Sequence, residues 1–213
     1  GLMLDSTTFY LGDVEMINQR LILLTSDIYK GFPSNGIMGY SIFGHYAPEF
    51  NYDENVMILH PCEDLVVDSS WTRVPLYFKG NNVPWLDGYI AVRNEHPVQI
   101  SMYIDYAAGD PVLLLEKPDM KFELPENTEK VHIGRGLSGD IFGETGYISK
   151  LIIGGYELGN VKVSIASAGV RSKQKEGDAI LGIGSLRRFN MIFDYAGKVL
   201  YIKPNSHFSE PFE

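Results

Sequence analysis

The sequence predicts an all-β protein made of two related lobes, and two observations lead to that prediction. One is an internal duplication, because residues 35–61 align without a gap with residues 178–204 at a constant offset of 143 (178 − 35). The other is the number of short runs rich in β-branched and aromatic residues, such as residues 76–80, 88–92 and 98–105. Two copies favour a pseudo-dimer over a solenoid.

The duplication extends over several structural elements. Its identical pairs are Ile37/Ile180, Gly39/Gly182, Phe50/Phe193, Tyr52/Tyr195, Val56/Val199 and Pro61/Pro204. Further upstream, residues 10–23 resemble residues 152–165 at an offset of 142. Each copy contains a Gly-centred hairpin, then an apolar run whose spacing suits about two turns of helix, then a second hairpin. We therefore expect one short helix near the end of each lobe.

Composition excludes several classes of partner. The chain of 213 residues has a net charge of −9, and no run of Lys or Arg exceeds two residues. Nucleic acid and anionic membranes are therefore not expected partners, and no apolar run has the roughly 20 residues of a membrane span. Cys62 is the single cysteine and the five histidines are scattered, so neither a metal nor another cofactor is expected. The oligomeric state and the compartment stay open, with export of the parent protein as one alternative.

The duplication also suggests domain boundaries. We expect a partial first lobe over residues 1–61, a connection over 62–84, a second lobe over 85–204 and an exit tail over 205–213. Strand-like sequence follows Gly1 at once and no initiator Met is present, so the sequence is expected to be a piece of a longer protein.

Three segments carry a resemblance to a known family. The chain resembles the retropepsin/pepsin family of aspartic proteases at residues 37–39 (Ile-Met-Gly), at residues 180–182 (Ile-Leu-Gly) and at Asp105 within residues 100–115. In that family each lobe carries an apolar-Asp-Thr/Ser-Gly loop early and an Ile-Leu-Gly element late. More narrowly, residues 134–143 (GRGLSGDIFG), the segment LRRFNMIFDY and the final FSEPFE resemble bacterial two-lobed aspartyl proteases with a C-terminal PDZ domain. That PDZ domain is not in these residues, and the resemblance covers roughly residues 8–213.

The resemblance implies an aspartic-type endopeptidase that acts on extended polypeptide. It implies acid-protease-like β-barrel lobes, the first of them N-terminally incomplete, and it makes Asp105 a catalytic residue. Tyr106, Gly109 and Gly139 become candidate substrate-binding residues. Subtracting 143 from 105 gives a position before Gly1, so a second catalytic aspartate is expected outside these residues. The chain by itself is expected to be inactive, because one carboxylate cannot act as both acid and base.

Alternatives remain at the site. Tyr106 and Ala107 stand where the family has Thr/Ser and Gly, so Asp105 is either a divergent catalytic residue or an acidic strand-end residue of a degenerate lobe. Asp5 is expected to be an ordinary strand or turn residue, because alignment of the copies places it near Gly146. Two other functions stay open. One is a non-catalytic protease-like module that binds peptide by strand addition. The other is an unrelated structural or glycan-binding β module.

Overall fold

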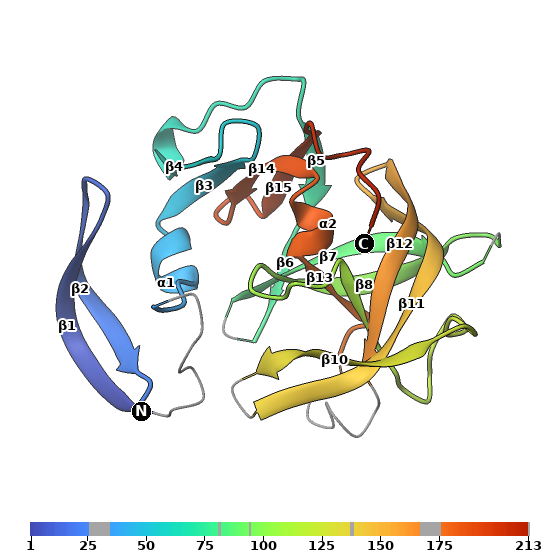
Figure 1. Ribbon diagram of the computed structural model, residues 1–213. Helices are drawn as coiled ribbons and strands as arrows, with labels where there is room; N and C mark the ends of the chain where they lie inside the picture. Colours follow the sequence, from blue (N-terminus) through green and yellow to red (C-terminus); the bar gives the residue numbers. More distant parts are fainter. Residues whose placement is uncertain (26–34, 81, 94, 137–138, 167–175, 213) are drawn as a thin grey trace. The chain divides into compact units, whose positions relative to one another are not determined.

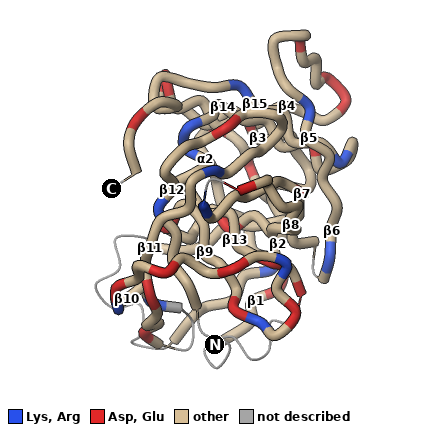
Figure 2. Tube along the Cα trace, turned by 90° about the vertical axis from the view of Figure 1, so that its right-hand side faces the viewer, with Lys and Arg blue, Asp and Glu red and all other residues tan. Residues whose placement is uncertain are grey.

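The computed structural model describes residues 1–25, 35–80, 82–93, 95–136, 139–166 and 176–212 (Figure 1). The chain divides into two compact units, Gly1–His45 and Tyr46–Glu213. Most of the described residues lie in strands, and the helices are short. Both Lys and Arg (blue) and Asp and Glu (red) are spread along the trace, although residues 49–68 contain acidic side chains and no Lys or Arg (Figure 2).

The first unit contains one hairpin and one short helix. Strands β1 (Leu2–Leu11) and β2 (Val14–Leu23) pair antiparallel. Gly12 begins the turn with φ +58°, which is a backbone conformation that glycine adopts at little cost. Helix α1 (Tyr40–Phe43) follows Gly39.

A closed ring of strands forms the centre of the second unit. Its eight-stranded sheet has the order β10-β11-β12-β9-β13-β8-β7-β6, and a further pairing of β11 with β7 closes the ring. The strands are β6 (Tyr77–Lys79), β7 (Val83–Ala91), β8 (Val98–Asp105), β9 (Val112–Leu115), β10 (Glu129–Gly136), β11 (Gly139–Ile153), β12 (Tyr156–Ala166) and β13 (Ala179–Gly182). Closure gives a small β-barrel whose interior is filled by side chains.

The burial of each strand matches its place in the barrel. In β8, Ile100, Met102 and Ile104 are buried and the residues between them are only partly buried, as expected where alternate side chains face the core. All four residues of β9 and of β13 are buried. These two strands carry apolar residues at nearly every position because protein covers both of their faces.

A second, five-stranded sheet has the order β4-β3-β14-β15-β5. Its strands are β3 (Tyr46–Asn51), β4 (Val56–Pro61), β5 (Thr72–Pro75), β14 (Phe189–Asp194) and β15 (Val199–Pro204). A 3-10 helix, η2 (Cys62–Asp64), follows β4, and helix α2 (Ile183–Leu186) precedes β14. Glu49 lies opposite Ile192, and these two residues correspond at the offset of 143. The two copies of the second hairpin therefore meet about a local two-fold axis.

Equivalent segments of the duplication have the same local structure. Leu11 pairs with Val14 at the end of the β1–β2 hairpin, and Ile153 pairs with Tyr156 at the end of the β11–β12 hairpin. The residues with positive φ also correspond, in the pairs Gly12/Gly154 (+58° and +57°), Asn18/Asn160 (+56° and +48°) and Asn55/Lys198 (+55° and +55°). Helices α1 and α2 begin 143 residues apart, but each has four residues instead of the expected two turns.

The copies differ at the Ile-x-Gly element. Residues 180–182 lie in β13, between two neighbouring strands, whereas residues 36–39 form no strand. An extended segment becomes a strand only where neighbours satisfy its backbone groups. Among the residues that the structure describes, the segment 36–39 has no such neighbours.

A buried arginine holds residues 205–212 against the rest of the second unit. Arg188 is 1% exposed, and its guanidinium lies 3.6 Å from the centre of the Phe212 ring. It donates hydrogen bonds to the backbone carbonyls of His207, Phe208, Glu210 and Pro211. Nothing in the doublet Arg187–Arg188 indicates from sequence that one of the two side chains is buried.

Candidate functional site

The region around Asp105 is built on a strand inserted between two others. Strand β13 pairs parallel with β8 and antiparallel with β9. Residues 106–111 connect β8 to β9 and therefore pass over the end of β13, which is a ψ-loop topology. The amide of Gly182 donates to the carbonyl of Pro111 at 3.2 Å, and the amide of Ile183 donates to the carbonyl of Ala108 at 2.9 Å. The end of β13 and the residue after it thus bind the connection through backbone hydrogen bonds.

The absence of a side chain at Gly182 allows the connection to approach the end of β13 closely. A Cβ atom at this residue would lie 2.1 Å from the carbonyl oxygen of Asp110 and 2.8 Å from that of Ala108. Its φ of −103° is available to any residue, so lack of space, not backbone conformation, requires the glycine.

Asp105 is the last residue of β8 and lies opposite Gly182. One carboxylate oxygen accepts the amide of Ala107 at 3.0 Å, and the carbonyl of Asp105 accepts the amide of Ala108 at 3.2 Å. These bonds form a tight turn that holds the half-buried carboxylate at the end of β8, where the ψ-loop connection begins. A carboxylate held this way can polarise a water molecule as a base. Among the described residues, no second carboxylate is hydrogen-bonded to it.

Tyr106 extends from the same turn into the interior. Its hydroxyl lies 2.8 Å from the hydroxyl of Tyr52, its ring stacks on Phe50 at 4.5 Å, and it meets Phe193 edge-on at 6.1 Å. Phe50 and Phe193 correspond in the duplication and also contact each other at 6.0 Å. Tyr106 therefore fastens the Asp105 turn to both copies of the second hairpin. A contact between its ring and a bound peptide stays a prediction.

Raising the pH above about 10 should destabilise the protein through Tyr106. Burial raises the pKa of this hydroxyl far above its ordinary value, and the neighbouring Tyr52 hydroxyl acts in the same direction. The unfolded chain then loses the proton at a lower pH than the folded chain does. The stabilising contribution is therefore complete below about pH 10 and is lost as the pH rises further.

Urea unfolding between about pH 8 and about pH 11 measures this dependence. The variant Tyr106→Phe removes the titrating hydroxyl, so its stability should fall less steeply, by up to about 1.4 kcal/mol per pH unit. Equal slopes for the two proteins would show that other tyrosines cause the loss.

The two glycines proposed for substrate binding lie on different loops. Gly109 is exposed in the connection that follows Asp105. Gly139 is the first residue of β11, has φ +119° and lies opposite Gly136 at the end of the β10–β11 hairpin. The next residue of this hairpin, Asp140, accepts hydrogen bonds from Arg135 at 2.8 Å and His132 at 3.2 Å. The Arg135 bond and then the His132 bond lower the pKa of Asp140.

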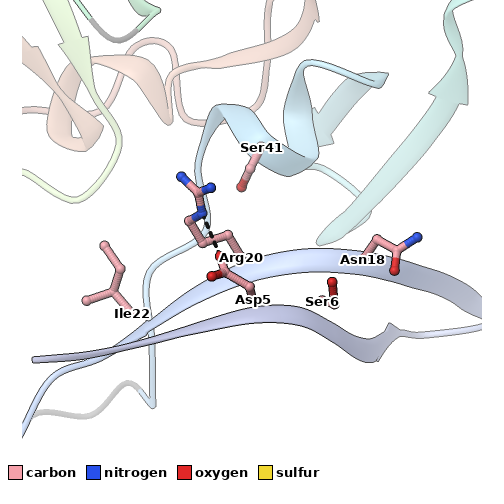
Figure 3. A pocket seen from close by; sticks show the side chains of 6 residues that line it. All are labelled: Asp5, Ser6, Asn18, Arg20, Ile22 and Ser41. Atoms are coloured by element: carbon pink, nitrogen blue, oxygen red, sulfur yellow. Dashed lines mark hydrogen bonds and ion pairs between the residues drawn. The ribbon is translucent and has the colours of Figure 1, made fainter.

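Asp5 lies in the first unit, within β1. It pairs with Arg20 of β2 at 3.0 Å, and both side chains are about 70% exposed. The two residues line an open hollow together with Ser6, Asn18, Ile22 and Ser41 (Figure 3). An exposed ion pair across a hairpin contributes little to stability, and its carboxylate already has a cationic partner.

The described residues provide neither a metal-binding cluster nor an activated thiol. They contain no group of three or more His, Cys, Asp or Glu side chains that could hold a metal ion. No helix in the same part of the chain is long and apolar enough to span a bilayer. Burial raises the pKa of the Cys62 thiol, and the charges of Asp194 and Glu63 add to this, which disfavours the reactive thiolate.

Comparison with solved structures gives a distant likeness. The chain is similar to the crystal structure of a retropepsin-like aspartic protease from Rickettsia conorii, with a TM-score of 0.42 and 17% sequence identity. The likeness covers 62% of this chain and 93% of that chain. No family profile matches the sequence, and no curated protein matches it significantly.

Proposed function

We propose that this chain is the Asp105-bearing part of a two-lobed aspartic-type endopeptidase that acts on extended polypeptide. The observation that carries the proposal is the position of Asp105. Its carboxylate lies at the end of β8, where the ψ-loop connection begins, on a turn whose Ala108 carbonyl accepts the amide of Ile183 and whose Tyr106 side chain packs in the interior. Rigid placement of a carboxylate is what activation of a water molecule requires.

The reaction needs a second carboxylate. Two carboxylates about 3 Å apart share one proton, so that one acts as base on the water and the other as acid on the scissile carbonyl. The local two-fold axis between Glu49 and Ile192 supports an arrangement in which a related lobe supplies the second group. In this proposal Gly109, beside Asp105, lets the peptide backbone approach, and Gly139 does the same from the β10–β11 hairpin.

In the longer protein that supplies the second carboxylate, Asp105→Asn should lower peptidase activity by about 10²–10⁴-fold, because the amide cannot take a proton from water. The assay follows cleavage of a denatured protein substrate at acid and at neutral pH, with and without pepstatin. Asp119→Asn is the matched control, because it removes the same charge from an exposed residue outside the ψ-loop and should leave activity unchanged. Activity that survives both Asp105→Asn and pepstatin would contradict the aspartic mechanism.

The packing of Tyr106 favours a second candidate function, a non-catalytic module that binds extended peptide. A phenol occupies the position where a small hydroxyl is expected, and Ala107 adds a Cβ atom beside it. If the module is non-catalytic, fluorescence polarisation should detect binding of a denatured polypeptide. That polypeptide should stay uncleaved, and Asp105→Asn should not alter the affinity.

A further inference from the structure

Strand β4 is an edge of the five-stranded sheet and has no strand on its outer side among the described residues. It is the first strand in the sheet order, with β3 on its inner side (Figure 1). Three consecutive apolar residues of β4 are exposed, namely Val56 at 43%, Met57 at 37% and Ile58 at 40%. An exposed apolar edge offers its backbone groups to another strand.

In the other copy of the duplication, a neighbouring strand covers the corresponding edge. Strand β15 corresponds to β4 and pairs antiparallel with β5, with Leu200 opposite Val74. Leu200 is fully buried and Val199 is only 7% exposed. These residues correspond to Met57 and Val56 at the offset of 143. The difference in exposure therefore coincides with the presence of a neighbouring strand on β15 and its absence on β4.

The register shows which backbone groups of β15 face its neighbour. The amide of Leu76 donates to the carbonyl of Lys198 at 2.8 Å, so the hydrogen-bonded positions of β15 fall on Lys198, Leu200 and every second residue. Pro75 lies opposite Val199, between two such positions, where its missing amide costs no hydrogen bond.

The same register applies to β4. Lys198 and Asn55 correspond and have the same φ of +55°, so the two strands leave their turns in the same way. The amides of Met57 and Leu59 then face outward, whereas those of Val56 and Ile58 face β3.

We propose that the outer edge of β4 binds an extended, uncharged polypeptide strand, antiparallel and in the register that β5 has on β15. The duplication also indicates the side chains of this strand. Arg73 of β5 lies over the Tyr201 ring at 5.4 Å, but Ile58 stands where β15 has Tyr201. The residue opposite Ile58 is therefore apolar, and the residue opposite Met57 is apolar like Val74. This surface is separate from Asp105 and does not depend on the proposed chemistry.

A peptide with the sequence of residues 71–77 and the change Arg73→Val tests the proposal. Amide hydrogen exchange by NMR is followed with increasing peptide. At saturation the amides of Met57 and Leu59 should exchange at least about tenfold more slowly, and those of Val56 and Ile58 should change little. The unchanged peptide, which keeps Arg73, should bind more weakly by about tenfold, or 1.4 kcal/mol.

Two variants of Met57 separate backbone pairing from other contacts. Met57→Pro removes an outward amide without touching the bonds to β3, so it should abolish the protection. Met57→Ala keeps that amide and should retain the protection at a higher peptide concentration. The proposal is wrong if the peptide leaves exchange unchanged, or if Met57→Pro still shows protection. It is also wrong if protection without peptide grows with protein concentration, because a second copy of the chain would then cover β4. The Asp105→Asn variant should bind the peptide normally, which keeps this test independent of catalysis.

Discussion

Gly182→Ala should lower the free energy of unfolding by about 3 kcal/mol, the upper range for overpacking a core. The new methyl group would lie 2.1 Å from the Asp110 carbonyl oxygen and 2.8 Å from that of Ala108. Both are backbone atoms, so no side-chain rotation relieves the clash. The connection that carries Asp105 must move instead, and Tyr106 with it. Urea unfolding measures the loss, and near-ultraviolet circular dichroism reports the displaced aromatic rings.

Gly39→Ala is the matched control, because Gly39 corresponds to Gly182 in the duplication. A Cβ atom at Gly39 meets nothing within 4 Å among the described residues, and its φ is −147°. This variant should change the stability by less than about 0.5 kcal/mol, as an uncrowded surface substitution does. A similar loss for the two variants would show that the crossing of β13 under the connection does not impose the requirement for glycine.

Arg188→Met should also destabilise the second unit, by on the order of 3 kcal/mol. The change keeps most of the buried side-chain volume but leaves the four carbonyls of the tail without their donor. Burial lowers the pKa of Arg188, yet a guanidinium stays charged in proteins, so the variant removes a buried charge along with the bonds. Residues 205–212 should become accessible to proteases and exchange their amides faster.

Arg187→Met is the control at the adjacent residue. Arg187 is about half exposed, and its distance to Glu210 is 3.7 Å. An exposed ion pair of this length contributes less than about 0.5 kcal/mol. If Arg187→Met released the tail as Arg188→Met does, the tail would be held by surface charge and not by the buried guanidinium.

Much of the local structure of this protein can be predicted from its sequence. The offsets of 142 and 143 correctly matched the hairpins and short helices of the two copies. Such elements can be predicted because turn type and side-chain alternation depend on only a few neighbouring residues. Asp105 was also identified from sequence as the end residue of a strand. The lengths of the helices were overestimated, because an apolar run such as residues 179–186 suits a buried strand as well as a helix.

The surroundings of Asp105, in contrast, depend on the tertiary structure. The insertion of β13 between β8 and β9 pairs Ala179 with Met102, 77 residues earlier (179 − 102), and with Leu114, 65 residues earlier (179 − 114). No local preference specifies which strands become neighbours. The inward direction of Tyr106 depends on Phe50 and Phe193, which come from different copies of the duplication. Arg188 is buried although arginine is usually exposed, because backbone carbonyls distant in the sequence surround it. These features depend on contacts between distant segments, whereas sequence patterns record mainly the preferences of near neighbours.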